Sequence, residues 1–133
     1  MKKFPFIIIA VLCLFFGCEY QPYSQGGILY KNNCANCHME DGSGLKGLIP
    51  PLAKADFLKD NQAQISCIIK NGIKGAITVN GRVYDTEMAG IQSLNEVQIN
   101  NVINYINHAW GNDFGDSNVA DVTARLEECK MEY

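Results

Sequence analysis

The sequence predicts one all-α domain that carries a small β-hairpin. Three segments, residues 24–34, 62–71 and 95–110, carry helix start or stop residues, and the last two also have apolar side chains at helical spacing. Residues 77–84 instead hold two short β-prone runs around an Asn-Gly pair. The chain has 133 residues, of which 47% are hydrophobic and 19% charged, values that are typical of a single packed domain.

The first helical segment begins at Ser24, whose side-chain oxygen is suited to capping a helix N-terminus, and it runs into Cys34. A loop is expected at residues 41–51, where three glycines and the pair Pro50-Pro51 interrupt regular structure. Residues 56–60 are expected to form a short helix.

The second helical segment, residues 62–71, has three isoleucines on its inward face and a glycine as its C-cap. These residues are Ile65, Ile68, Ile69 and Gly72. The hairpin that follows pairs residues 77–79 with residues 82–84. Its turn is Asn80-Gly81, a dipeptide favoured in type I′ turns because both residues tolerate positive φ.

The third helical segment is capped by Asn95, and Gln98 three residues later completes a capping-box pattern. Gly111 is expected to end it. Its apolar stripe consists of Val102, Ile103, Ile106, Ala109 and Trp110. Residues 112–121 are rich in turn formers, and residues 122–130 predict a last helix.

Residues 1–17 have the composition of a signal peptide, with a basic start and a 13-residue apolar run that is too short to span a bilayer. Gly17-Cys18 follows, and a small residue before a cysteine at this point resembles the lipobox of bacterial lipoproteins. The resemblance implies export, lipidation of Cys18 and residues 18–24 as a tether to the periplasmic side of a bacterial membrane. Ordinary cleavage near Tyr20, without a lipid, is the alternative.

The charge balance argues against one class of partner. A net charge of −3 gives no electrostatic basis for nucleic-acid binding. Removal of residues 1–17, which carry Lys2 and Lys3, changes the net charge to −5. A partner with a positive surface would therefore be steered toward the mature chain.

The six cysteines fall into groups. Cys13 lies in the signal segment and Cys18 directly after it, while two more lie in the motif at residues 34–38. Cys67 and Cys129 remain. Because exported proteins fold in an oxidising compartment, this last pair predicts a disulfide, with two unpaired thiols as the alternative.

The sequence Cys34-Ala35-Asn36-Cys37-His38 matches the attachment signature of haem c. Two thiols at this spacing add across the two haem vinyl groups, and the adjacent histidine binds the iron. A thioredoxin-like redox pair would need a βαβ context, which the sequence does not predict. A four-ligand zinc site would need two more ligands, and His108 with Cys67 is poorly spaced for that.

With this motif in place, the chain resembles the class I cytochromes c over roughly residues 26–110. Gly26 and Tyr30 stand eight and four positions before Cys34, as a glycine and an aromatic residue do in that family. The family packs the glycine against an aromatic residue of the C-terminal helix, where this chain has Tyr105. The resemblance implies the cytochrome c fold, with three core helices around one covalent haem.

The resemblance also implies the roles of individual residues. His38 is the proximal iron ligand, the carbonyl of Pro50 accepts a hydrogen bond from its imidazole, and Leu52 contributes to the haem wall. Met88 is the distal ligand, followed by Ala89 where the family usually has proline. Other methionines and histidines weighed for the distal position are Met39, Met131 and His108. Expected wall or core residues are Leu58, Ile68, Ile69, Ile91, Leu94 and Val102.

Residues 25–111 would then form the cytochrome domain, and residues 112–133 a C-terminal extension packed on it. The resemblance implies a low-spin, His/Met-ligated electron carrier of a bacterial periplasmic respiratory chain, not an enzyme. Its expected partners are redox proteins, such as a membrane oxidoreductase or a periplasmic reductase. The alternatives are a peroxidase-like or ligand-sensing haem protein and an accessory subunit fixed in one oxidoreductase complex.

Overall fold

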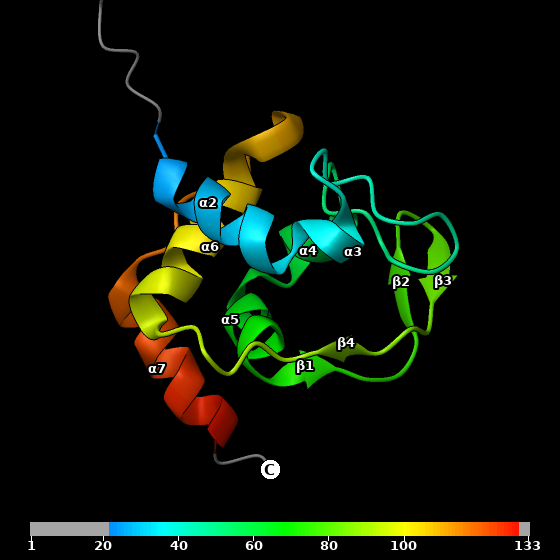
Figure 1. The fold of residues 1–133 in the computed structure, drawn as a ribbon. Helices are drawn as coiled ribbons and strands as arrows, with labels where there is room; N and C mark the ends of the chain where they lie inside the picture. The colour runs from blue at the N-terminus through cyan, green and yellow to red at the C-terminus, as the bar shows by residue number, and fades with distance from the viewer. Residues whose placement is uncertain (1–21, 131–133) are drawn as a thin grey trace, which may run out of the picture.

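Helices dominate residues 22–130, the part of the chain that the computed structural model describes (Figure 1). This confirms the helical class expected from the sequence. The helical elements are α2 (Ser24–Asn33), α3 (Ala35–His38), α4 (Asp56–Asp60), α5 (Gln62–Asn71), α6 (Glu96–His108), the 3-10 turn η1 (Ala109–Gly111) and α7 (Val119–Lys130). No helix within residues 22–130 has the length and hydrophobicity needed to cross a bilayer.

Two small antiparallel sheets accompany the helices. Strands β2 (Ile77–Val79) and β3 (Arg82–Tyr84) form the expected hairpin, with φ values of 50° and 73° at Asn80 and Gly81 as a type I′ turn requires. The second sheet pairs β1 (Gly72–Ile73) with β4 (Met88–Ala89) and was not expected. It joins the end of α5 to the segment that carries Met88.

Helices α2 and α6 cross at Gly26. A Cβ atom on this glycine would lie 2.7 Å from Cβ of Tyr105 and would overlap the carbonyl oxygen of Asn101. Only a residue without a side chain permits this approach. The expected contact between Gly26 and Tyr105 is therefore confirmed, and it sets the distance between the two helices.

Both caps expected for α5 and α6 are present. Gly72, with φ 86°, is the C-cap of α5. At the start of α6, the side chain of Asn95 accepts a 2.9 Å hydrogen bond from the Gln98 N–H, and the Gln98 side chain accepts a 3.0 Å bond from the Asn95 N–H. This reciprocal pair is the predicted capping box.

Two expected helix ends are wrong. Ser24 lies inside α2, and the N-cap is Tyr23, whose backbone is left-handed and whose side chain makes no capping bond. The Tyr23 ring instead stacks on His108, with ring centroids 4.6 Å apart, and this contact fixes how the chain enters α2. Helix α6 ends at His108 and not at Gly111, because its C-cap Ala109 has an extended backbone with a ψ of 157°. Trp110, with a φ of 56°, follows in the left-handed region.

The C-terminal helix α7 begins at Val119, three residues earlier than expected, because the Asn118 side chain accepts a 2.9 Å hydrogen bond from the Asp121 N–H. It packs against α5 and α6 with one apolar face. The buried members of that face are Val122, Leu126 and Cys129. A disulfide joins Cys129 to Cys67 of α5, with their Cα atoms 6.0 Å apart.

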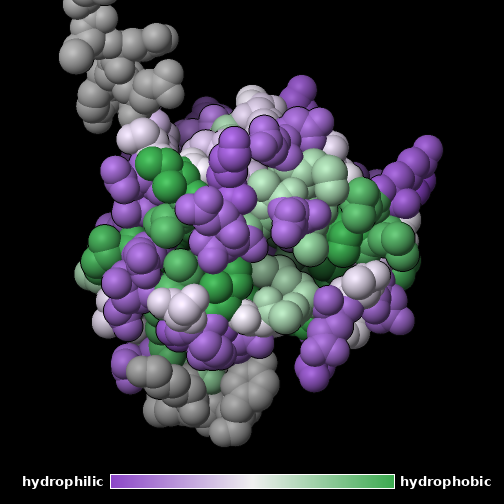
Figure 2. Space-filling view, viewed as in Figure 1, coloured by the Kyte–Doolittle hydropathy of each residue, from purple (hydrophilic) through white to green (hydrophobic). Residues whose placement is uncertain are grey.

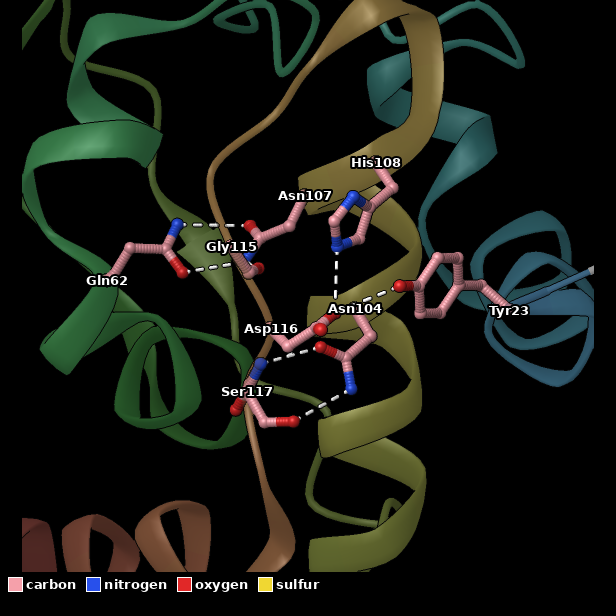
Figure 3. Close-up of polar contacts among 8 residues, drawn as sticks. All are labelled: Tyr23, Gln62, Asn104, Asn107, His108, Gly115, Asp116 and Ser117. Carbon is pink, nitrogen blue, oxygen red and sulfur yellow. Dashed lines mark hydrogen bonds and ion pairs between the residues drawn. The ribbon is translucent and has the colours of Figure 1, made fainter.

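Side-chain amides attach the segment between η1 and α7 to the core (Figure 3). Asn104 of α6 exchanges two hydrogen bonds with the backbone of Ser117, of 2.7 and 3.0 Å. Asn107 donates to the carbonyl of Gly115 and exchanges two further bonds with Gln62 of α5. Residues 115–117 are therefore held against α6 by specific hydrogen bonds, while the disulfide separately joins α7 to α5.

Candidate functional site

A mostly apolar cavity of about 470 Å³ lies between the helices and the two small sheets. Its size is within the range of about 300–1,000 Å³ found for ligand sites. Six residues proposed from the sequence line this one cavity: Cys34, Cys37, His38, Pro50, Leu52 and Met88. Of the six expected wall residues, five also line it, and the sixth, Leu94, is buried in the core beside it.

One turn of backbone presents the two thiols and the imidazole to the cavity. The N–H of Cys34 donates to the carbonyl of Tyr30 at the end of α2. The carbonyl of Cys34 then accepts bonds from the N–H groups of Cys37 and His38, at 3.1 and 2.9 Å. Burial first, and the neighbouring Cys37 second, raise the pKa of the Cys34 thiol to about 11. Cys34 is half-buried, whereas Cys37 is exposed, so the cavity reaches the surface beside this turn.

The imidazole of His38 is buried and oriented. Its Nδ1 atom lies 3.1 Å from the carbonyl oxygen of Pro50. Because a carbonyl only accepts, Nδ1 carries the proton, and Nε2 retains the lone pair that a metal ligand needs. Burial lowers the pKa of His38, while the bond to Pro50 opposes this shift, and the neutral ring is favoured.

Close backbone contacts position the loop that supplies Pro50. Gly44, with φ 65°, donates its N–H to the His38 carbonyl at 3.0 Å, and a Cβ on Gly44 would lie 2.6 Å from the Pro50 oxygen. The hydroxyl of buried Tyr30 donates to the Met39 carbonyl at 2.6 Å. These contacts hold the chain on both sides of His38, so its ring has little freedom to turn.

Met88 faces the cavity from the opposite wall, on β4. Its strand pairs with β1, where Ile73 stands opposite Met88 and Gly72 opposite Ala89. A Cβ on Gly90 would lie 2.5 Å from the carbonyl carbon of Asn71, so the two segments are in direct backbone contact. Strand pairing therefore holds Ala89, the residue after Met88, in place without the proline that the resemblance leads us to expect there.

The other candidates for the distal position lie elsewhere. Met39 follows His38 on the same wall and does not line the cavity. His108 is on the far side of α6, stacked on Tyr23 and 2.9 Å from a carboxylate oxygen of Asp116. Met131 falls outside the described residues, as does Cys18, the expected lipidation site.

Asn112 is a positioning residue that the sequence reasoning missed. It is 5% exposed, and its Nδ2 donates to the carbonyls of Leu52 and Ile106, at 3.1 and 2.7 Å. Its Oδ1 accepts a 2.6 Å bond from the Lys54 N–H. It thus ties the cavity loop to the end of α6. Its partners are main-chain groups up to 60 residues away, so no local pattern signals the role.

The two other interpretations of the cysteine motif lack their context. The segment before Cys34 is helix α2, whereas a thioredoxin-like site requires a preceding strand. Within residues 22–130, no three His, Cys, Asp or Glu side chains gather as a metal-binding group, which leaves zinc without a ligand set there. Two free thiols, one oriented imidazole and a thioether around an apolar cavity do fit a covalently bound haem.

Comparisons with known proteins agree with this fit. The chain matches the cytochrome c family profile over residues 23–110. It is 34% identical over 92 residues to cytochrome c-552 of Thermus thermophilus, an alignment that spans 66% of this chain and 70% of that protein. It is 30% identical over 93 residues to the cytochrome c subunit of the quinone alcohol dehydrogenase of Gluconobacter oxydans, which spans 68% of this chain and 19% of the subunit.

A further match is the corresponding subunit from Komagataeibacter europaeus, 34% identical over 102 residues, which spans 74% of this chain and 21% of the subunit. The chain thus aligns with most of a small cytochrome and with about a fifth of each larger subunit. From the profile match and these relatives, the chain belongs to the cytochrome c family, as a class I mono-haem c-type cytochrome that binds haem c covalently and transfers electrons.

Proposed function

We propose that this chain is a one-electron carrier whose haem is attached to Cys34 and Cys37 and ligated by His38 and Met88. The observation that carries the proposal is that these four side chains line one cavity: Cys34 from the junction of α2 and α3, Cys37 and His38 from α3, and Met88 from β4. Helices α2, α5 and α6 are the three core helices that we expect to enclose the haem.

Each side chain has a distinct task. The bound haem supplies a one-electron iron couple. The bond from His38 Nδ1 to the Pro50 carbonyl fixes the ring and raises the basicity of Nε2. A thioether ligand from Met88 favours ferrous iron and so raises the reduction potential. Leu52 and the other apolar wall residues exclude water from the site.

Electron transfer would occur without making or breaking a bond. If His38 and Met88 both held the iron, no open site would remain for a substrate, which would favour electron transfer over oxygen or peroxide chemistry. The exposed Cys37 marks where the site approaches the surface. Hydrophobic residues also gather on the face that carries the β2–β3 hairpin, at the right of Figure 2, where Val83 is 63% exposed. A redox partner would dock briefly near this edge.

Paired methionine substitutions test the ligation. Met88→Leu keeps the side-chain volume but removes the sulfur, so the ferric protein should lose its methionine-to-iron charge-transfer band and its potential should fall. Met39→Leu is the matched control, because Met39 lies outside the cavity. It should leave both properties unchanged. Survival of the band in Met88→Leu would rule out Met88 as the ligand.

The proposed setting is the periplasmic side of a bacterial membrane, with residues 1–17 removed, Cys18 lipidated and residues 18–24 as the tether. Because Tyr23 packs on His108 and Ser24 begins α2, only residues 19–22 of this tether could extend, to about 14 Å. The cytochrome domain (25–111) and its extension (112–133) would therefore stay near one membrane face. Fractionation tests this. Recovery of Cys18→Ser in the same membrane fraction as the wild type would argue against the anchor.

A second candidate role is that of a subunit fixed in one oxidoreductase complex. It is favoured by the similarity to the cytochrome c subunits of quinone alcohol dehydrogenases. Copurification from detergent-solubilised membranes separates the roles. A stoichiometric dehydrogenase partner supports the fixed subunit, and a monomeric cytochrome that exchanges electrons with several proteins supports the free carrier.

A further inference from the structure

The segment from Met88 to Leu94 has little regular structure of its own. Only residues 88–89 belong to a strand, and the chain then turns before α6 begins at Glu96. Backbone carbonyls in such a segment need hydrogen-bond donors from elsewhere in the protein. The position of the Met88 side chain depends on where those donors are.

Lys70 supplies two of them. Its ammonium Nζ donates to the carbonyl oxygens of Gln92 and Leu94, at 2.8 Å each. In return, the side chain of Gln92 donates to the Lys70 carbonyl at 2.9 Å. A lysine suits this task because one nitrogen carries three donors, enough to satisfy two carbonyls that face the same point.

Lys70 lies where the cavity wall, the segment after Met88 and the start of α6 meet. It lies in the last turn of α5, next to Ile69, which lines the cavity and whose carbonyl accepts a 2.8 Å bond from the Ile91 N–H. Leu94, which it holds, directly precedes the N-cap of α6. The Lys70 ammonium thus joins the cavity wall, the segment after Met88 and the start of α6.

We propose that Lys70 is a positioning residue for the distal ligand, which keeps Met88 at the iron by clamping the segment that follows it. This inference rests on the His38/Met88 ligation proposed above and extends it to a side chain that does not line the cavity. Lys74 also contacts the chain next to Met88, but in a different way from Lys70. It forms a 3.1 Å ion pair with Glu87, in which the two side chains are 80% and 58% exposed. Exposed pairs of this sort restrain a chain only weakly.

Competition by imidazole measures the clamp. Added imidazole binds ferric iron only when Met88 is displaced, so its apparent affinity follows the fraction of open molecules. In the haem-loaded protein, Lys70→Met should bind imidazole about tenfold more tightly than the wild type. Lys70→Arg should restore part of the difference, because it returns donors to the same place. Lys59→Met, an exposed lysine on α4, is the matched control and should behave as wild type.

The outcomes separate the two proposals. If Met88→Leu binds imidazole more tightly than wild type but Lys70→Met does not, the Lys70 proposal is overturned and the ligation stands. A wild type that already binds as tightly as Met88→Leu overturns both. Should Lys70→Met not accumulate, Gln92→Ala removes the return bond and should shift the affinity in the same direction by a smaller factor. An unchanged affinity in that variant also overturns the clamp.

Discussion

His38 Nδ1 and the carbonyl oxygen of Pro50 lie 3.1 Å apart, although the two residues are twelve positions apart in the sequence. The contact decides which ring nitrogen carries the proton and so which one is available to iron. It depends on the tight turn at Gly44 between them, which passes close to the Pro50 carbonyl and leaves its oxygen within reach of Nδ1.

The rigidity of Pro50 should slow the opening of this hydrogen bond. Pro50→Ala keeps the carbonyl but frees the φ angle of residue 50. The restriction of φ by a proline contributes about 0.4–1 kcal/mol of stability. In the ferrous protein, the Nδ1 proton of His38 should then exchange with solvent about two- to fivefold faster by NMR. Pro51→Ala is the control, because the Pro51 carbonyl is not the partner of His38. Equal acceleration in both variants would contradict the assignment.

Gly26→Ala should destabilise the folded protein strongly. The new methyl group would overlap the Asn101 carbonyl and crowd Tyr105, and overpacking of this kind costs about 1–3 kcal/mol. Denaturant unfolding measures the loss. Gln25→Ala, an exposed change on the same helix, should stay within about 0.5 kcal/mol of wild type. A Gly26→Ala protein as stable as this control would show that α2 and α6 can separate freely.

The Cys67–Cys129 disulfide should stabilise the fold without changing the haem spectrum. Its residues are 62 positions apart, for which chain entropy gives an upper value of about 4 kcal/mol. The double variant Cys67→Ser/Cys129→Ser should therefore unfold at lower denaturant while it retains the methionine-to-iron band. Non-reducing mass spectrometry checks the bond itself. Two alkylatable thiols in the mature holoprotein would show that it does not form.

Asp116 should make the attachment of the extension sensitive to acid. Hydrogen bonds from Tyr23 first, and from His108 second, lower the pKa of its carboxyl. When folding lowers the pKa of a carboxyl, the ionised carboxylate stabilises the fold. This stabilisation is complete above the pKa of the unfolded chain, near 3.9, and is lost as the pH falls through the lower pKa of the folded state. The stability difference between wild type and Asp116→Asn should be largest at neutral pH and shrink below about pH 4. Asp113→Asn is the control, and a pH-independent difference for Asp116→Asn would refute the prediction.

The sequence predicted those structural features in which the interacting residues lie close together along the chain. The spacing of residues 34–38, the Asn95/Gln98 capping box and the Asn80-Gly81 turn each involve residues a few positions apart, so backbone geometry alone links them. The resemblance to the class I cytochromes, and not residue spacing, pointed to Pro50 and Met88. The structure places both on the cavity.

Contacts that join a side chain to a distant backbone group were not predictable. Lys70 donates to carbonyls 22 and 24 residues away, and a carbonyl is present at every position, so it carries no sequence signal. The β1–β4 pair has two residues in each strand, too few for an alternating pattern. The left-handed backbone of Tyr23 and Trp110 reflects contacts of their rings with His108 and Gly42, which the fold creates.

The disulfide between α5 and α7 also closes the chain into a covalent ring of residues 67–129. Met88 lies inside this ring, whereas Cys34, Cys37 and His38 lie outside it. A protease cut in the exposed segment at residues 85–87, between β3 and β4, would therefore open the ring without releasing either piece. A cut in the loop at residues 45–48 would divide the polypeptide into two pieces with no bond of the protein chain between them, held together by packing such as the α2–α6 crossing and, under the proposed ligation, by the haem. The disulfide thus keeps the two ends of a cut near Met88 joined, whereas no such bond spans a cut near His38.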